Sequence, residues 1–246
     1  MVNESPQFWA LIPAAGIGRR MESCLPKQYL SILDKTVLEH TLQRFLSLSM
    51  ISGVMVVVCE NDIVWPKMTL YSHPKLLTCL GGKERALSVM NGLNALSSHA
   101  KPNDWVLVHD AARPCIRPSL ILHLIERLKE HPVGGILGLP QQDTLKQIQS
   151  IYEHPQGGVE GIIDKTVDRA KVWSAQTPQM FRYALLRDAL QSALITGKQI
   201  TDEAQAIELR GLFSLLVEGS WENIKLTYPD QLQLARFILQ MQDNIA

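Results

Sequence analysis

A glycine-containing loop followed by basic residues is the part of the sequence best suited to chemistry. Gly16 and Gly18 come directly after a short apolar stretch, and Arg19, Arg20 and Lys27 follow them closely. The backbone N–H groups of such a loop, with cations beside them, suit a polyphosphate better than a single carboxylate. The sequence therefore predicts that this loop binds a polyphosphate.

A dinucleotide-binding loop is the first alternative for this segment. Its fingerprint needs a third small residue where this chain has Met21. It also needs an acidic residue at the tip of a second strand about 20 positions on, and Glu60 lies too far along the chain. A plain glycine-rich turn with solvated arginines is the second alternative. Neither alternative explains the other polar groups of the chain.

Polar groups follow several of the apolar stretches. In an open parallel sheet, ligands bind outside the carboxyl ends of the strands. A single polar residue at a strand end is usually a cap or a turn residue, but several groups at one edge predict a binding site. The groups are Gly16, Gly18, Arg20 and Lys27; Gly81, Gly82, Arg85 and Ser88; and residues 109–114, 175–179, 201–204 and 223–227.

The apolar patterns that would position these groups alternate between strand-like and helix-like. Strands separated by helices of about 10–15 residues give a mainly parallel sheet with helices on both faces. We therefore expect a Rossmann-like α/β fold in one domain, residues 1–246. The expected strands are 8–12, 53–59, 75–80, 105–108, 134–139 and 213–218, and the expected helices are 37–47, 84–96, 120–130, 183–195, 201–209 and 230–241.

Residues 141–171 depart from this alternation. They are polar, with strand candidates at 144–148 and 161–167 around a turn-rich segment at 154–158. This pattern predicts a protruding β-hairpin arm. A lone two-stranded hairpin is marginal in water, and most homo-oligomers are two-fold dimers, so a second copy is the expected partner. A mobile surface insertion is the alternative.

Composition and charge restrict the class of protein. The chain has 24 Lys and Arg against 24 Asp and Glu, so no overall field attracts nucleic acid or an anionic membrane. No apolar run approaches the roughly 18 residues that a membrane span requires. The short apolar run near the N-terminus is interpreted as a strand and not as a signal peptide. The scattered cysteines, at 24, 59, 79 and 115, are typical of reduced thiols in a cytoplasmic protein.

Motifs over nearly the whole chain resemble those of nucleotidyltransferases that make CDP-activated polyols. They are residues 14–21 (AAGIGRRM), 26–29 (PKQY), 81–85 (GGKER) with Ser88, 108–114 (VHDAARP), 143–146 (DTLK), 166–169 (TVDR) and 223–225 (NIK). Together they most resemble the 2-C-methyl-D-erythritol 4-phosphate cytidylyltransferase family of the non-mevalonate isoprenoid pathway. The resemblance implies that CTP and this polyol phosphate react to give CDP-methylerythritol and pyrophosphate, with Mg²⁺ as cofactor, in a homodimer joined through the arm.

The resemblance also implies roles for individual residues. Arg20 and Lys27 would neutralise the α-phosphoryl group and the departing pyrophosphate, and Lys225 and Arg169 would act as cations for the polyol phosphate, with Arg169 and Thr144 reaching the site of the other subunit. Asp110 would contact Mg²⁺, directly or through water, or the ribose. The expected nucleotide-binding residues are Ala14, Ala15, Gly16, Gly18, Gly81, Gly82, Ser88, Asp110 and Ala111, and the expected substrate-binding residues are Arg113, Thr144, Arg169, Thr177, Thr201 and Lys225.

Two other functions stay open at this point. A ribitol 5-phosphate cytidylyltransferase would share the nucleotide half of the site and differ in the acceptor pocket. A non-catalytic nucleotide-binding module would keep the fold, but loss of the Arg20 and Lys27 pair would be expected in it, and both residues are present.

Overall fold

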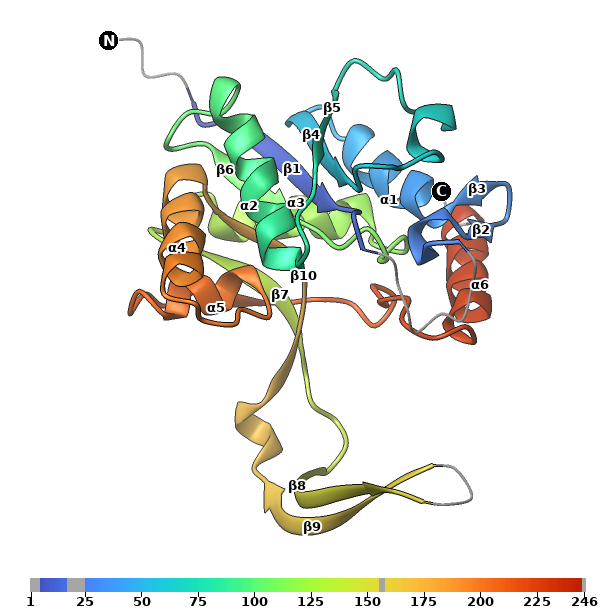
Figure 1. Ribbon diagram of the computed structural model, residues 1–246, viewed down its shortest axis with the longest axis vertical. Helices are drawn as coiled ribbons and strands as arrows, with labels where there is room; N and C mark the ends of the chain where they lie inside the picture. The colour runs from blue at the N-terminus through green and yellow to red at the C-terminus, as the bar shows by residue number, and fades with distance from the viewer. Residues whose placement is uncertain (1–4, 17–24, 155–157, 245–246) are drawn as a thin grey trace.

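The computed structural model describes residues 5–16, 25–154 and 158–244. In this part of the chain the main sheet has the strand order β11-β7-β10-β6-β1-β4-β5 (Figure 1). All neighbouring strands are parallel except β10, which is antiparallel to both β6 and β7. The strands are β1 (Phe8–Pro13), β4 (Ile51–Val58), β5 (Leu76–Leu80), β6 (Trp105–Val108), β7 (Gly134–Pro140), β10 (Trp173–Arg182) and β11 (Leu215–Glu218). The expected mainly parallel α/β fold is confirmed.

Helices cover both faces of this sheet because its strands are apolar on both sides. In β1, Ala10 and Ile12 pack with α1 and α3, whereas Trp9 and Leu11 pack with α2, α4 and α5. A third cluster joins α6 to the loop that follows β6. The helices are α1 (Val37–Leu46), α2 (Arg85–Ala95), α3 (Pro118–Leu128), α4 (Tyr183–Ile195), α5 (Glu203–Glu208) and α6 (Gln231–Asp243). Within the described ranges, none of the helices is long and apolar enough to cross a membrane.

Short elements connect the larger ones. A two-stranded ladder of β2 (Ser31–Ile32) and β3 (Lys35–Thr36) precedes α1. Thr36 and Glu39 then form a reciprocal capping box at the first turn of α1, which fixes where that helix begins. The 3₁₀ helices are η2 (Lys27–Tyr29), η3 (Trp65–Lys67), η4 (Leu96–Ser98) and η5 (Arg169–Lys171).

Strand β10 was not among the expected strands. Its sequence is polar in part and contains Pro178, and a proline in the middle of a sheet removes a hydrogen bond of the ladder, which argues against a central strand. The structure accommodates it by a register shift between Gln176 and Gln179 against β7. This irregular strand lies between β6 and β7, so it brings the 175–179 segment to the end of β6.

The expected arm is present as an antiparallel hairpin of β8 (Leu145–Glu153) and β9 (Val159–Val167), both longer than predicted. It extends away from the main sheet from the ends of β7 and β10 (Figure 1). Apolar side chains of the hairpin are exposed, among them Ile151 at 69% and Val159 at 70%. The predictions of one domain and of an arm that serves dimerisation stay predictions.

Candidate active site

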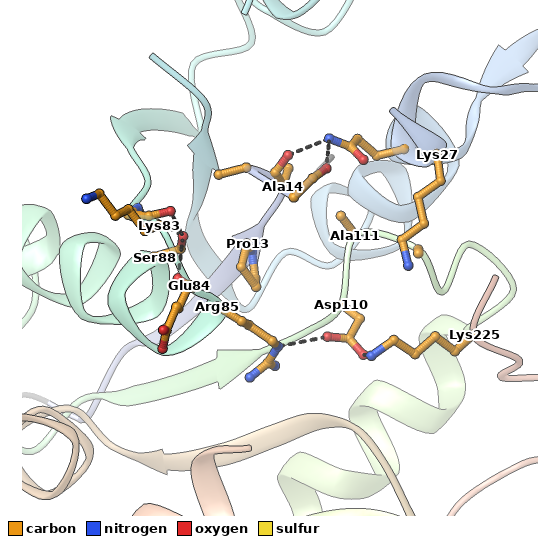
Figure 2. A pocket seen from close by; sticks show the side chains of 15 residues that line it. Pro13, Ala14, Lys27, Lys83, Glu84, Arg85, Ser88, Asp110, Ala111 and Lys225 are labelled. Atoms are coloured by element: carbon orange, nitrogen blue, oxygen red, sulfur yellow. Dashed lines mark hydrogen bonds and ion pairs between the residues drawn. The ribbon is translucent and has the colours of Figure 1, made fainter. Parts of the chain in front are cut away.

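A cavity of about 240 Å³ lies at the carboxyl ends of β1, β5 and β6 (Figure 2). The loops after these strands and the segment after β11 form its walls. Many of the residues that the sequence singled out line it, among them Ala14, Ala15, Gly16, Lys27, Gly82, Arg85, Ser88, Asp110, Ala111 and Lys225. Gly18 and Arg20, which were also expected there, lie outside the described residues.

Close approach of two loops gives one wall its shape. A Cβ atom on Gly81 would lie 2.4 Å from the Cβ of Ala15 and 2.9 Å from Oγ of Ser88, so a larger residue would separate the loops. Ser88 is buried, and its hydroxyl accepts a hydrogen bond from the N–H of Gly82 at 3.1 Å. Gly81 therefore contributes by packing behind the cavity, and Ser88 both lines the cavity and holds the loop.

Gln28 holds the loop of Ala14–Gly16 in place, a role that we did not predict. Its side-chain Nε2 donates hydrogen bonds to the backbone oxygens of Ala14, at 2.6 Å, and Gly16, at 3.1 Å. The side chain is buried, so these bonds are shielded from water. The signal in the sequence was the position of Gln28 directly after Lys27. That position alone does not predict that the side-chain amide of Gln28 donates to the backbone of the glycine loop.

Asp110 is surrounded by cations. Its carboxylate lies 2.8 Å from Nζ of Lys225, 3.2 Å from Nε of Arg85 and 3.5 Å from Nε of Arg113. Burial by itself would raise the pKa of Asp110, but the charges of Arg85, Lys225 and Arg113 outweigh it and hold the pKa far below its ordinary range. Asp110 is therefore ionised at neutral pH, and it fixes the positions of three basic side chains. Figure 2 shows two of them, Arg85 and Lys225.

Arg85 links this cluster to α5. Besides Asp110, it pairs with both carboxylate oxygens of Glu203, at 2.6 and 3.1 Å. The side chain of Glu203 is only 1% exposed. Burial would lower the pKa of Arg85, but the two carboxylates raise it well above its ordinary value. The sequence placed Arg85 at a strand end without assigning it a function, because its partner Glu203 is 118 positions away.

A second cavity of about 200 Å³ adjoins the first and shares Arg85, Asp110 and Lys225 with it. Three of the predicted substrate-binding residues, Arg113, Thr177 and Thr201, line this second cavity together with Lys225. Gln176, Gln179 and Asp202 also line it and were not predicted individually. We call the first cavity the nucleotide cavity and the second the acceptor cavity.

Hydrogen bonds between polar residues hold the far wall of the acceptor cavity. Gln179 donates to Asp202 at 2.9 Å and accepts from the N–H of Ala204 at 2.9 Å. Asp202 in turn caps α5 through the N–H of Gln205. These bonds fix the start of α5 against β10. They therefore also fix the position of Thr201, which directly precedes Asp202.

The structure does not bring Thr144 and Arg169 to either cavity of the same chain. Both residues are exposed on the arm, and Arg169 donates a hydrogen bond to the backbone oxygen of Gln142. Lys27 and Lys225, by contrast, come from distant segments and line the same cavity. Nζ of Lys27 donates to the backbone oxygen of Leu226 at 3.0 Å, which joins the two segments.

A mainly parallel α/β sheet with two adjoining cavities at the carboxyl ends of its strands, and with Arg85 and Lys225 at their common wall, suits an enzyme that binds two anionic substrates side by side. The model of the 2-C-methyl-D-erythritol 4-phosphate cytidylyltransferase family matches residues 8–241. The chain belongs to this family and is an enzyme, a nucleotidyltransferase.

Individual relatives agree with this assignment. The chain is 47% identical to a protein of Vibrio vulnificus (strain YJ016) over 99% of both chains, and 44% identical to one of Pseudomonas putida (strain GB-1) over 96% of this chain and 97% of the relative. Both relatives are named 2-C-methyl-D-erythritol 4-phosphate cytidylyltransferase.

Solved structures show the same likeness. A crystal structure of a 4-diphosphocytidyl-2C-methyl-D-erythritol synthase matches with a TM-score of 0.80 and 38% identity, over 95% of this chain and 99% of the other. The Francisella tularensis 2-C-methyl-D-erythritol 4-phosphate cytidylyltransferase matches with a TM-score of 0.77 and 35% identity, over 94% of this chain and 99% of the other.

Proposed function

We propose that the chain transfers the cytidylyl group of CTP to the phosphate of 2-C-methyl-D-erythritol 4-phosphate and releases pyrophosphate. The observation that carries this proposal is the common wall of the two cavities, formed by Arg85, Asp110 and Lys225. A nucleotide in one cavity and a phosphate ester in the other would have their phosphates beside this wall. The reaction joins two anions, so the protein contributes positioning and charge neutralisation.

The cations divide between the two substrates. Lys27 lines the nucleotide cavity but not the acceptor cavity, and we assign it to the triphosphate together with Arg20. Arg113 lines the acceptor cavity but not the nucleotide cavity, and we assign it to the acceptor phosphate. Lys225 lines both cavities, so it suits the transferred phosphoryl group, where negative charge is concentrated as the new bond forms.

Backbone groups of the glycine loop are suited to select the base. Cytosine differs from uracil by an amino donor that needs a hydrogen-bond acceptor. The backbone oxygens of Ala14 and Gly16 each accept one bond from Gln28, and a carbonyl oxygen accepts two, so each keeps one lone pair. Because Gln28 fixes these oxygens, they are preorganised to accept from a cytosine amino group.

The residues fit a magnesium ion that arrives with the nucleotide. Among the described residues, no group of three or more His, Cys, Asp or Glu side chains is placed to hold a metal ion. Mg²⁺ usually keeps several waters and is bound by one or two carboxylates and substrate phosphates. Glu84 and Asp110 line the nucleotide cavity and would supply these carboxylates. The bound ion would neutralise the triphosphate.

We propose that the arm forms a homodimer and carries Thr144 and Arg169 to the acceptor cavity of the partner. The exposed apolar side chains of the hairpin support this, because a two-stranded ladder with both faces in water is marginal. Replacing Ile151 by Glu should convert dimers to monomers in sedimentation experiments and lower activity. Ile63, similarly exposed at 73% but outside the arm, gives the matched control, Ile63→Glu. Equal behaviour of the two variants would rule out the arm as the interface.

We also propose that the protein acts in the cytoplasm. Cys59, Cys79 and Cys115 are free thiols. Burial raises the pKa of Cys79 to about 11 and, as the largest influence, that of Cys115 to about 12, so both stay protonated. Unreactive, unpaired thiols are typical of proteins in reducing compartments.

The activity is tested with purified protein, Mg²⁺, and a panel of nucleotides and acceptors, with pyrophosphate release as the signal. We expect release with CTP and 2-C-methyl-D-erythritol 4-phosphate, and little with UTP. Release with ribitol 5-phosphate alone would contradict the acceptor, and no release with any acceptor would contradict the activity. Binding of CTP without turnover would then favour a nucleotide-binding module.

A further inference from the structure

The three side chains of the 3₁₀ helix η2 reach three different segments of the chain. Nζ of Lys27 donates to the backbone oxygen of Leu226, and Nε2 of Gln28 donates to the glycine loop after β1. The hydroxyl of Tyr29 donates to Oδ2 of Asp62 at 2.6 Å, in the loop that follows β4. Because β1 and β4 are neighbouring strands, η2 is held at the carboxyl ends of both.

The position of η2 depends on these contacts, because a single 3₁₀ turn has few hydrogen bonds of its own. The N–H of Tyr29 donates to the backbone oxygen of Pro26 at 2.9 Å, and the N–H of Leu30 donates to that of Lys27 at 3.2 Å. Pro26, at the start of the turn, has no polar side chain with which to cap it. The side chains of η2 must therefore fix its orientation.

The contact between Tyr29 and Asp62 is fixed at both ends. Oδ1 of Asp62 accepts hydrogen bonds from the N–H groups of Val64, at 3.0 Å, and Trp65, at 2.9 Å, which leaves Oδ2 for Tyr29. The ring of Tyr29 is 5% exposed and belongs to the same core cluster as Trp65. A hydroxyl 2.6 Å from a carboxylate oxygen lies in the range of strong, charge-assisted hydrogen bonds. Tyr29 is thus a rigid attachment point for η2.

We propose that Tyr29, held by Asp62, is a positioning residue that fixes η2 and thereby directs the ammonium group of Lys27 to the triphosphate of CTP. Lys27 lines the nucleotide cavity, whereas Tyr29 and Asp62 do not (Figure 2). The two residues therefore act through Lys27 and not by contact with the substrate. This inference rests on the proposed function, since it concerns the cation assigned to the triphosphate.

The effect of this positioning should appear in kcat. A cation that neutralises charge in the transition state must be in place beforehand, and a displacement of about 1 Å can cost on the order of 10²-fold in rate. The stem of Lys27 is flexible, and Gln28 would still hold the glycine loop. Loss of the Tyr29 contact should therefore cost less than loss of Lys27 itself.

The test is Tyr29→Phe, which removes the hydroxyl and keeps the buried ring. We expect kcat to fall about tenfold, the effect of one hydrogen bond to a charged group, with KM for CTP changed by less than about twofold. The matched control is Tyr183→Phe. Tyr183 is also buried, its hydroxyl donates to the backbone oxygen of Leu93 at 3.1 Å, and it lines neither cavity. The control should lower the melting temperature, as Tyr29→Phe does, and leave kcat unchanged.

Two double variants separate positioning from a general loosening of the fold. If Tyr29 acts through Lys27, adding Tyr29→Phe to Lys27→Ala should not lower kcat further. Adding Tyr29→Phe to Asp62→Ala should also have little effect, because both substitutions remove the same contact. A further loss of about tenfold in either background would mean that the effects are independent and would overturn the inference.

Other results would also overturn it. They are an unchanged kcat in Tyr29→Phe, a loss confined to KM for CTP, or an equal loss of kcat in Tyr183→Phe. Folding is checked by circular dichroism, and if Tyr29→Phe does not fold, Asp62→Ala replaces it in the combination with Lys27→Ala. Failure of both to fold would show that the contact holds the fold as a whole, which contradicts a specific role for Lys27. A wild-type enzyme that releases no pyrophosphate with any acceptor would overturn the proposed function itself, and that result is distinguishable because it involves no variant.

Discussion

Two ion pairs of this chain have nearly the same geometry and differ in burial. Arg85 meets Glu203 at 2.6 and 3.1 Å, and Arg117 meets Glu222 at 2.6 and 3.1 Å. The side chain of Glu203 is 1% exposed, whereas that of Glu222 is 39% exposed. Replacing each arginine by Met removes one such pair of hydrogen bonds, and Arg85→Met also removes the contact of Arg85 with Asp110. We predict that Arg85→Met is much more destabilising than Arg117→Met.

The magnitude follows from the buried carboxylate. Without Arg85, the buried carboxylate of Glu203 loses its basic partner. Removal of one partner of a buried ion pair costs about 3–5 kcal/mol. Loss of the exposed pair should cost about 1 kcal/mol or less. In melting temperature, these losses correspond to about 10 °C and about 3 °C or less.

Thermal and urea unfolding at pH 7, followed by circular dichroism, measure both losses. Equal losses in the two arginine variants would refute the reasoning.

Three further predictions concern the same rim of the sheet. Lys27→Ala should lower kcat about 10²–10³-fold with little change in melting temperature, and a kcat near that of the wild type would remove Lys27 from the mechanism. Gly81→Ala should lower the melting temperature and weaken CTP binding measured by calorimetry, because the added Cβ would lie 2.4 Å from the Cβ of Ala15. The control is Gly16→Ala, whose added Cβ has nothing within 4 Å and should leave the melting temperature unchanged. The lowered pKa of Asp110 stabilises the folded protein at pH values above its ordinary pKa near 3.9, and this stability is lost as the pH falls further. The free energy of urea unfolding should therefore depend less on pH in the acidic range for Asp110→Asn than for the wild type. Parallel curves of this free energy against pH would contradict the prediction.

The strands were predicted well where both faces are buried. β1, β4 and β6 are nearly continuous apolar runs, and such runs are typical of parallel strands covered on both sides. β10 was not found, because Pro178 and its polar neighbours contradict the pattern of a central strand. Its place is stabilised by two neighbouring strands, a tertiary effect that outweighs local preference.

The orientation of α2 shows a smaller failure of the same kind. The apolar spacing within the expected helix 84–96 predicts Leu87 on its inner face. In the structure Leu87 is 36% exposed, and Ala86 and Val89 are buried instead. Several apolar residues compete for the buried face of this helix. The Gly81–Gly82 turn and the contacts of Ser88 set its rotation, and these depend on the neighbouring loop.

The alternation of strands and helices, and the set of polar groups at the carboxyl ends of the strands, could be predicted from the sequence. These features follow from local patterns, because each strand end is fixed by its own apolar run. How those groups pair depends on the folded chain. Arg85 with Glu203, Gln28 with the glycine loop, and His109 with Thr177 join segments whose separation in the chain carries no information about distance in space. The division of the rim into two cavities with a common charged wall therefore appears only when the sheet is assembled.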